Sequence, residues 1–200
     1  ILSIFLFFIM GIMIFVFSIG ANNDIFNQIG IGIIWTLILL TNNLTLRKFY
    51  QDDFNDGSLI IFHLSGLSYE VIVLIKLVVN WLVVQIPFLV LIPISGFLLN
   101  IDFFNIKIIF VSFLLGSPIT TCITSISGSM NLLNKKNFAI GSLIIMILSI
   151  PVIIFSVGLI GTEKELMRAQ INILMGIMFL FLAITPWVCS ICIKLAIQEK

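Results

Sequence analysis

The sequence of 200 residues is 60% hydrophobic and 10% charged, with a net charge of +1 at pH 7 and a mean hydropathy of +1.27. This composition leaves too little polar surface to cover a soluble globule of this size, which excludes an ordinary water-soluble domain. The near-neutral charge and the absence of Lys or Arg runs argue against a nucleic-acid partner. We therefore expect an integral membrane protein, with membrane lipid as its surroundings.

Six windows of the sequence contain no Asp, Glu, Lys or Arg, and each can supply the roughly 20 apolar residues that a helix needs to cross a bilayer. Barrel strands would alternate apolar and polar side chains, and the opening run ILSIFLFFIMGIMIFVF does not. We predict an all-α fold, a polytopic membrane protein of six transmembrane helices in a single domain over residues 1–200. The windows are 1–23, 25–46, 77–101, 108–134, 137–162 and 169–193.

The basic residues between these windows predict the orientation of the chain, because Lys and Arg are enriched in cytoplasmic loops. The connections between spans 2 and 3 and between spans 4 and 5, together with the C-terminal tail, carry Arg47, Lys48, Lys135, Lys136, Lys194 and Lys200. The opposite side carries Lys107, Lys164 and Arg168. This bias predicts that residues 47–59 and the C-terminus lie in the cytoplasm, or in the matrix if the membrane is mitochondrial.

A polar stretch, RKFYQDDFNDGSL at residues 47–59, separates the second and third spans. Carboxylates or a serine before an apolar run indicate a helix start, since negative charge is favourable at the positive end of the helix dipole. We expect a short interfacial helix with its acidic end in water and its apolar side against the membrane or other helices. The acidic end would be Asp52, Asp53, Asp56, Gly57 and Ser58, and the apolar side Leu59, Phe62, Leu64 and Leu67.

This acidic cluster has three candidate roles. A calcium loop fails, because Phe54 stands at a ligand position and His63 stands where the bidentate Glu is required. A solvated cap for a cytoplasmic turn and a docking element for a soluble partner both remain compatible with the sequence.

Lys76 is a charge within an otherwise apolar run, between VIVLI and LVVNWLVV. If the third span begins near Val71, Lys76 lies about 7 to 8 Å deep, and its ammonium group can extend to the cytoplasmic interface. Alternatively, Lys76 and Asn80 lie one turn apart on a face that points into the protein, where Lys76 would meet a substrate carboxylate or a neighbouring Asp.

The fourth span repeats small and hydroxyl side chains at intervals of four residues. This spacing favours close helix packing, with a polar lining for a substrate path as the alternative. Prolines in the third, fourth and fifth spans are expected to kink their helices. The small and hydroxyl residues are Ser112, Gly116, Ser117, Thr120, Thr121, Thr124, Ser125, Gly128 and Ser129, and the prolines are Pro87, Pro93, Pro118 and Pro151.

Features that suggest haem or metal binding do not form a site in this sequence. His63 is the only histidine, so a pair of His ligands within one chain is excluded. Cys189 and Cys192 have the C-x-x-C spacing, but Ile193 follows where haem attachment requires His. We predict no metal site, no catalytic residue and no cofactor held by this chain.

Four sequence strings, taken in order, resemble the haem exporter protein B (CcmB) family. They are GIIW at 32–35, DDFNDGSL at 52–59, LIKLVVNW at 74–81 and LLGSP at 114–118, and the second is the most specific. Members of this family are the membrane permease subunits of the cytochrome c maturation ABC transporter. They usually begin with a cytoplasmic amphipathic segment, so the resemblance implies that this segment is missing here.

The resemblance implies an ABC-2-type permease in which the segment between spans 2 and 3 is a coupling helix. Asp52, Asp53, Asp56, Gly57 and Ser58 would then contact a cytoplasmic ABC ATPase of the CcmA type. The chain contains no G-x-x-x-x-G-K-[ST] motif, so ATP is expected to bind to that partner, with haem as a possible substrate. The other implied partners are a haem-handling membrane protein of the CcmC type and a small subunit of the CcmD type.

Two classes of function follow from these expectations. The first is an ATP-driven permease for haem export or haem-chaperone release, and the second is a non-transporting scaffold for the ATPase and its haem-handling neighbours. A less favoured alternative is an ABC-2 permease for another substrate. The first two place the chain in a bacterial inner membrane or the mitochondrial inner membrane.

Overall fold

The structure, a computed structural model, describes residues 2–20, 23–133, 139–160 and 163–198, and the regular structure among these residues is helical. The helices are α1 (Leu2–Ile19), α2 (Asn23–Asn55), α3 (Ser58–Leu64), α4 (Tyr69–Asn80), the π-helix η1 (Trp81–Gln85), α5 (Ile86–Leu98), α6 (Phe103–Leu133), α7 (Ala139–Val157) and α8 (Lys164–Gln198). The segments α4, η1 and α5 follow one another without a break.

Within the described residues, six helical segments are long and apolar enough to cross a membrane, which confirms the predicted all-α, polytopic architecture. Their bounds differ from those of the uncharged windows: Lys164–Gln198 extends past its window at both ends and Ile25–Asn55 at one, where polar residues continue the helix, whereas Leu2–Ile19 is shorter than its window. They are Leu2–Ile19, Ile25–Asn55, Tyr69–Leu98, Phe103–Leu133, Ile140–Val157 and Lys164–Gln198.

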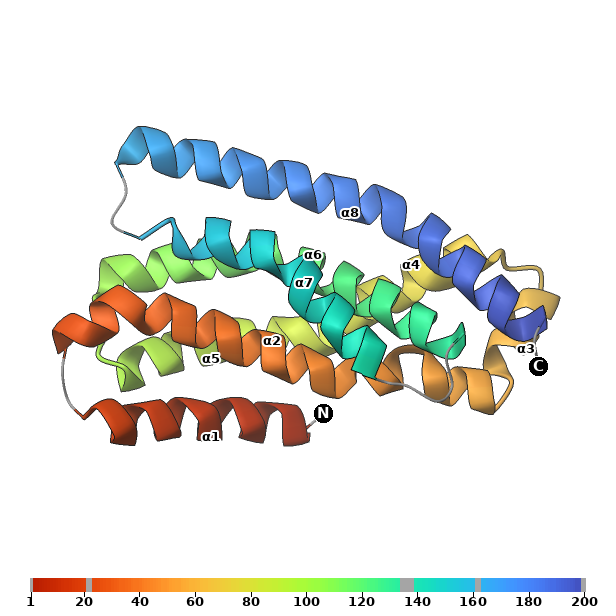
Figure 1. The fold of residues 1–200 in the computed structure, drawn as a ribbon, viewed down its shortest axis with the longest axis horizontal. Coiled ribbons are helices and arrows are strands. Elements are labelled where there is room, and N and C mark those ends of the chain that lie inside the picture. Colours follow the sequence, from red (N-terminus) through yellow and green to blue (C-terminus); the bar gives the residue numbers. More distant parts are fainter. Residues whose placement is uncertain (1, 21–22, 134–138, 161–162, 199–200) are drawn as a thin grey trace.

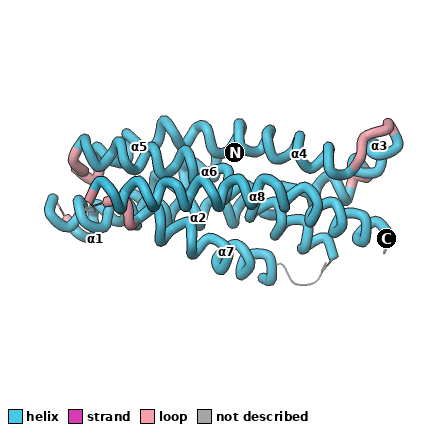
Figure 2. Tube along the Cα trace, turned by 90° about the horizontal axis from the view of Figure 1, so that it is seen from above, coloured by secondary structure: helices cyan, strands magenta, loops and turns pink. Residues whose placement is uncertain are grey.

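The spans lie side by side along the long axis of the molecule, with α1 and α8 on opposite sides (Figure 1). The most apolar windows of α2 and α6 are each 61% buried, against 17% for α1, so α2 and α6 form the centre of the bundle. The helix α3 and the C-terminal end of α8 lie at one end, and the turn between α5 and α6 lies at the other. Figure 2 shows the same separation from above.

The outer surface of the bundle is apolar, as a lipid environment requires. Phe17 on α1 is 82% exposed, Phe97 on α5 is 86% exposed and Trp187 on α8 is 69% exposed. A soluble protein would bury most side chains of this size, so these faces are the ones that contact lipid.

The small residues of α6 lie in the interior, where α6 packs against α2, α7 and α8. A Cβ atom added at Gly116 would lie 2.3 Å from the ring of Trp35 on α2. The Trp35 indole N–H also donates to the Ser112 hydroxyl, at 3.3 Å. Small side chains therefore allow the two central helices to approach each other closely, as the packing interpretation predicts.

Pro87 lies just after a local change of helix type. The N–H of Ile86 bonds back to the Trp81 carbonyl, five residues earlier, which is the spacing of a π-helix. Proline lacks an N–H and so leaves the preceding turn without a regular i to i−4 bond, and a π-turn is one way to absorb this irregularity.

Candidate functional site

The predicted acidic residues lie at the end of the bundle, but two of them are not where the helix-start signal placed them. Asp52 and Asp53 belong to the last turn of α2 rather than to the first turn of α3. The polar residues after position 46 continue α2, and the break in the chain comes only at Gly57, which adopts a left-handed conformation with φ of 83°. A side chain at that φ would be strained, so Gly57 determines where the two helices separate.

The turn between α2 and α3 is closed by two hydrogen bonds. The Asp56 N–H donates to the Asp52 carbonyl at 3.0 Å, and the Ser58 N–H donates to the Asp56 carboxylate at 2.9 Å. Asp56 is therefore the acidic residue that stabilises the start of α3, in line with the expected role of a carboxylate at that position. The Asp52 and Asp56 side chains are exposed, and Asp53 is partly buried.

The short helix α3 has one buried contact and one exposed apolar surface. Leu59 is fully buried, whereas Ile61 is 63% exposed, Phe62 43% exposed and Leu64 80% exposed. Of the four residues predicted to form its apolar side, only Leu59 is fully buried. The exposed members of α3 lie at the same end of the bundle as the last turn of α2, which carries Asp52.

Leu59 enters a hydrophobic cluster that connects the end of α3 to four of the spanning segments. The cluster contains residues of α2, α4, α6 and α8. Its buried members are Phe49, Tyr50, Phe54, Leu59, Tyr69, Ile72, Val73, Leu77, Cys122, Ile126, Leu132, Cys189, Ile193 and Ala196. Because α3 packs directly on α2 and α4, a displacement of α3 would reach α6 and α8 through these two helices.

Lys76 of α4 contacts the last turns of α2. Its ammonium group forms an ion pair with the Asp53 carboxylate, donates to the Phe49 carbonyl at 2.7 Å and lies 5.2 Å from the centre of the Tyr50 ring. Its side chain is 20% exposed and that of Asp53 is 31% exposed. The contact anticipated for an inward-facing Lys76 with a neighbouring Asp is thus present, and the neighbour is Asp53.

Asn80 lies with Lys76 and Asp53 on the wall of a cavity of about 450 Å³. The cavity lies between α1, α2, α3 and the α4–η1 segment. Its lining residues are Ile4, Thr45, Lys48, Phe49, Asp53, Phe62, Ile75, Lys76, Val79, Asn80, Val83 and Val84. The predicted site residues therefore divide into an outward group at the turn and an inward group at this cavity.

Sequence reasoning did not identify a second polar link, between α4 and α8. The Ser190 hydroxyl and the Lys194 ammonium group both donate to the Glu70 carboxylate, at 2.5 Å and 3.0 Å. The only available signal was the sequence Ser68-x-Glu70 at a helix start, and the Ser68 hydroxyl does accept from the Val71 N–H, at 3.4 Å. Nothing in the spacing indicated that the partners are about 120 residues away.

His63 contacts residues of the loop between α3 and α4 and of the start of α4. Its ring stacks on Tyr69 with 4.2 Å between the ring centres, and its Nδ1 atom lies 3.0 Å from the Leu67 carbonyl oxygen. These contacts hold the loop between α3 and α4 against the start of α4. Among the described residues, no group of three or more His, Cys, Asp or Glu side chains is arranged to hold a metal ion.

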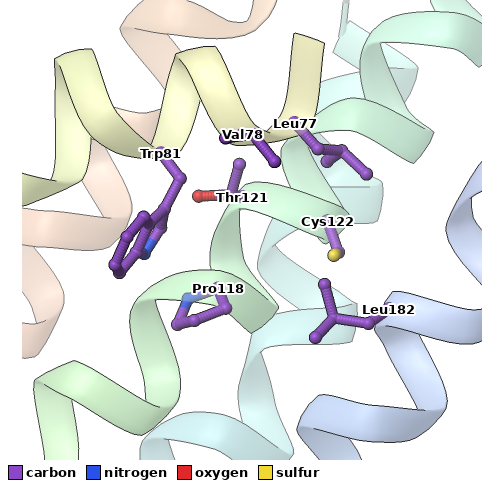
Figure 3. A pocket seen from close by; sticks show the side chains of 7 residues that line it. All are labelled: Leu77, Val78, Trp81, Pro118, Thr121, Cys122 and Leu182. Atoms are coloured by element: carbon purple, nitrogen blue, oxygen red, sulfur yellow. The ribbon is translucent and has the colours of Figure 1, made fainter. Parts of the chain in front are cut away.

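A smaller cavity, of about 190 Å³, lies between the α4–η1 segment, α6 and α8. Figure 3 shows Leu77, Val78 and Trp81 from the first segment, Pro118, Thr121 and Cys122 from α6, and Leu182 from α8 around it. The Trp81 indole N–H donates to the Ser117 hydroxyl at 3.0 Å, and the Thr121 hydroxyl donates to the Ser117 carbonyl at 2.9 Å. Because these polar groups are already bonded, the cavity is an apolar space.

The spanning helices and the short helix anchored at one end define a polytopic, all-α membrane protein. A family model described as CcmB protein matches residues 1–196. The chain belongs to the CcmB family, as the four sequence strings indicated.

Curated relatives support this assignment over most of the chain. "Heme exporter protein B" of Haemophilus influenzae is 28% identical over 195 residues, which are 96% of this chain and 88% of the relative. The protein of the same name from Bradyrhizobium diazoefficiens is 29% identical over 153 residues, 76% of this chain and 69% of the relative. That from Escherichia coli K12 is 38% identical over 85 residues, 42% of this chain and 39% of the relative.

Proposed function

We propose that this chain is the membrane subunit of an ATP-driven complex for cytochrome c maturation, with α3 as the coupling helix on which a cytoplasmic ABC ATPase of the CcmA type docks. The chain would couple ATP hydrolysis on that partner to haem export or to release of a haem chaperone. Family membership supports the complex, and the names of the relatives support a role in haem handling. The lack of a nucleotide-binding motif in the chain is consistent with a separate ATPase.

The observation that carries the proposal is the burial of Leu59. A helix of seven residues is too short to be stable alone, and Leu59 fixes it to a cluster shared by α2, α4, α6 and α8. A partner that moves α3 would therefore move the ends of several spans, because close-packed interiors transmit displacement rather than absorb it.

The proposed docking surface consists of the exposed side chains of the turn and of α3. Asp52 and Asp56 supply negative charge, and Ile61 and Leu64 supply apolar area that the chain itself leaves uncovered. A charged rim around exposed apolar side chains is typical of a protein interface. Gly57 and Ser58 would contribute by holding the turn in shape.

The proposed orientation places α3 and the C-terminal end of α8 on the cytoplasmic side of a bacterial inner membrane, or on the matrix side of a mitochondrial one. Lys48 and Lys194 lie at the α3 end, and Lys107 and Lys164 lie toward the other. Lys135, Lys136 and Lys200, which also entered the charge count, lie outside the described residues.

The close packing at the centre of the bundle favours release of a haem chaperone over passage of haem through this chain. Gly116 leaves no room for even one additional carbon atom against Trp35. On this basis the chain transmits the movement of the ATPase to a haem-handling neighbour of the CcmC type, with a small subunit of the CcmD type in the same complex.

Copurification of the ATPase subunit tests the docking surface. The double variant Asp52→Ala/Asp56→Ala removes both exposed carboxylates and leaves Asp53 on Lys76. We expect it to retain less ATPase than the unaltered protein and to lower cytochrome c assembly in the same cells. Asp102→Ala removes an exposed carboxylate at the opposite end and should change neither.

The proposal is wrong if the double variant inserts normally and keeps both ATPase binding and cytochrome c assembly. The acidic residues would then only solvate the turn. Loss of ATPase binding in Asp102→Ala would also contradict it, because it would place the docking surface at the other end of the bundle.

A further inference from the structure

The cavity of about 450 Å³ beside Lys76 has a charged part and an apolar part. Among the described residues that line it, Lys48 and Lys76 bring two positive charges to its wall, against the one negative charge of Asp53, and the exposed Asp52 carboxylate acts on Lys76 from outside the wall. Thr45 and Asn80 add polar groups, and the remaining wall is formed by aliphatic and aromatic side chains. The cavity therefore has a surplus of positive charge next to a hydrocarbon-like surface.

We propose that this cavity binds an amphiphile with an anionic head, a phosphate or a carboxylate, and an apolar body. The head would lie between Lys48 and Lys76, and the body would extend along Val79 and Val83. A volume of about 450 Å³ is within the usual range of about 300–1,000 Å³ for ligand sites. It is large enough for a lipid headgroup with the first part of its chains, or for one edge of a dicarboxylate macrocycle.

The present partners of Lys76 indicate how such a ligand would bind. The ammonium group has one carboxylate partner, Asp53, and one neutral acceptor, the Phe49 carbonyl. An ammonium group can donate three hydrogen bonds, so an anionic oxygen can take the third position or displace Asp53. The exposed Lys48 side chain would add a second positive charge to the same head.

Binding at this site does not depend on the ATPase, because every residue that lines the cavity belongs to this chain. Two kinds of ligand have this chemistry, an anionic membrane lipid and a carboxylate-bearing haem. Both present negative oxygens next to an apolar body, and the experiment separates them.

The test is binding to the purified full chain in a nonionic detergent. Native mass spectrometry would count retained dioleoylphosphatidylglycerol and, as a zwitterionic control, dioleoylphosphatidylcholine, and visible absorption would follow added haem. We expect a saturable site that prefers an anionic amphiphile over phosphatidylcholine. If only phosphatidylglycerol is retained, the site binds an anionic lipid. If only haem is retained, the site binds the carboxylate of haem.

Four variants decide whether the cavity is the site. Lys76→Met should weaken binding about tenfold, because a charge-assisted hydrogen bond in a partly buried position is lost, and Lys48→Gln should weaken it about threefold. Asp53→Asn should tighten binding, because it removes the carboxylate that competes for Lys76. Lys107→Gln removes a positive charge that lies over the Phe103 ring toward the other end of the bundle, and should have no effect.

Equal retention of phosphatidylcholine and phosphatidylglycerol, with no haem bound, would overturn the proposal. If Lys48→Gln and Lys107→Gln weakened binding equally, the proposal would also be overturned, because the effect of a positive charge would then not depend on its position relative to the cavity. If Lys76→Met does not fold, the opposite directions expected for Lys48→Gln and Asp53→Asn still test the site.

Discussion

Replacement of Leu59 by Ala should loosen α3 without changing the surface that α3 exposes. Leu59 is fully buried, whereas Leu64, on the same helix, is 80% exposed. Leu64→Ala is therefore a matched control, because it removes the same atoms from the same element. The two variants separate the attachment of α3 from its exposed docking surface.

The magnitude follows from burial. Truncation of a fully buried Leu to Ala costs about 2.7 to 5 kcal/mol, from lost transfer free energy and the cavity left behind. We take the lower value, about 2.7 kcal/mol, because a helix of seven residues at the surface can partly collapse into the space. At about 1.4 kcal/mol for each factor of ten, local opening of α3 should become about 100-fold more frequent.

Amide hydrogen exchange measures this opening directly. The N–H groups of Ile60 and Ile61 both bond to the Gly57 carbonyl, at 3.0 Å and 3.2 Å. Their exchange should be about 100-fold faster in Leu59→Ala and nearly unchanged in Leu64→Ala. In cells, Leu59→Ala should keep ATPase copurification and lose cytochrome c assembly, whereas Leu64→Ala should weaken copurification.

Equal exchange at these amides in the two variants would refute the reasoning, because Leu59 would then not be the anchor of α3. Loss of ATPase copurification in Leu59→Ala, with normal copurification in Leu64→Ala, would refute the separation of docking from transmission. Both results require that the variants insert into the membrane at normal levels.

Two further predictions concern the packing of the bundle. A double-mutant cycle of Lys76→Met and Asp53→Asn, measured by thermal unfolding in detergent, should give a coupling energy of about 1 to 2 kcal/mol. This value lies between the coupling energies of exposed ion pairs and those of fully buried ones. If the effects of the two substitutions on stability are additive, the ion pair is contradicted. Gly116→Ala should lower stability by about 1 to 3 kcal/mol because its Cβ would meet Trp35 at 2.3 Å, whereas Gly176→Ala, with nothing within 4 Å, should not.

The spans could be predicted from sequence because a bilayer requires long uncharged windows, and these are visible without any knowledge of contacts. Their ends could not, because polar side chains at a membrane surface are free to continue a helix. Asp52 and Asp53 illustrate this limit: carboxylates are typical of a helix start, yet here they end α2. The left-handed Gly57 determines the boundary, and an Asp-Gly pair such as Asp56-Gly57 is typical of a turn.

For a charged side chain, the sequence could predict the sign of its partner's charge but not which residue the partner is. A lysine within an apolar window indicates a nearby anion, but the choice of Asp53 depends on how α4 crosses the end of α2. Glu70 lacked any such signal, because its partners Ser190 and Lys194 are brought to it by the packing of α4 against α8. Contacts of this range arise from the tertiary fold and not from local spacing.

The last turn of α2 places two adjacent carboxylates in different surroundings, and this arrangement connects the two proposals. Asp52 is exposed at the docking surface, while Asp53 holds Lys76 at the cavity. A partner that shifts this turn must also strain or break the ion pair, since successive helix residues move together. Conversely, an anion that takes Lys76 from Asp53 removes one of the contacts that hold the last turn of α2. The affinity of the cavity for its ligand and the affinity of the turn for its partner should therefore depend on each other, with equal magnitude in both directions.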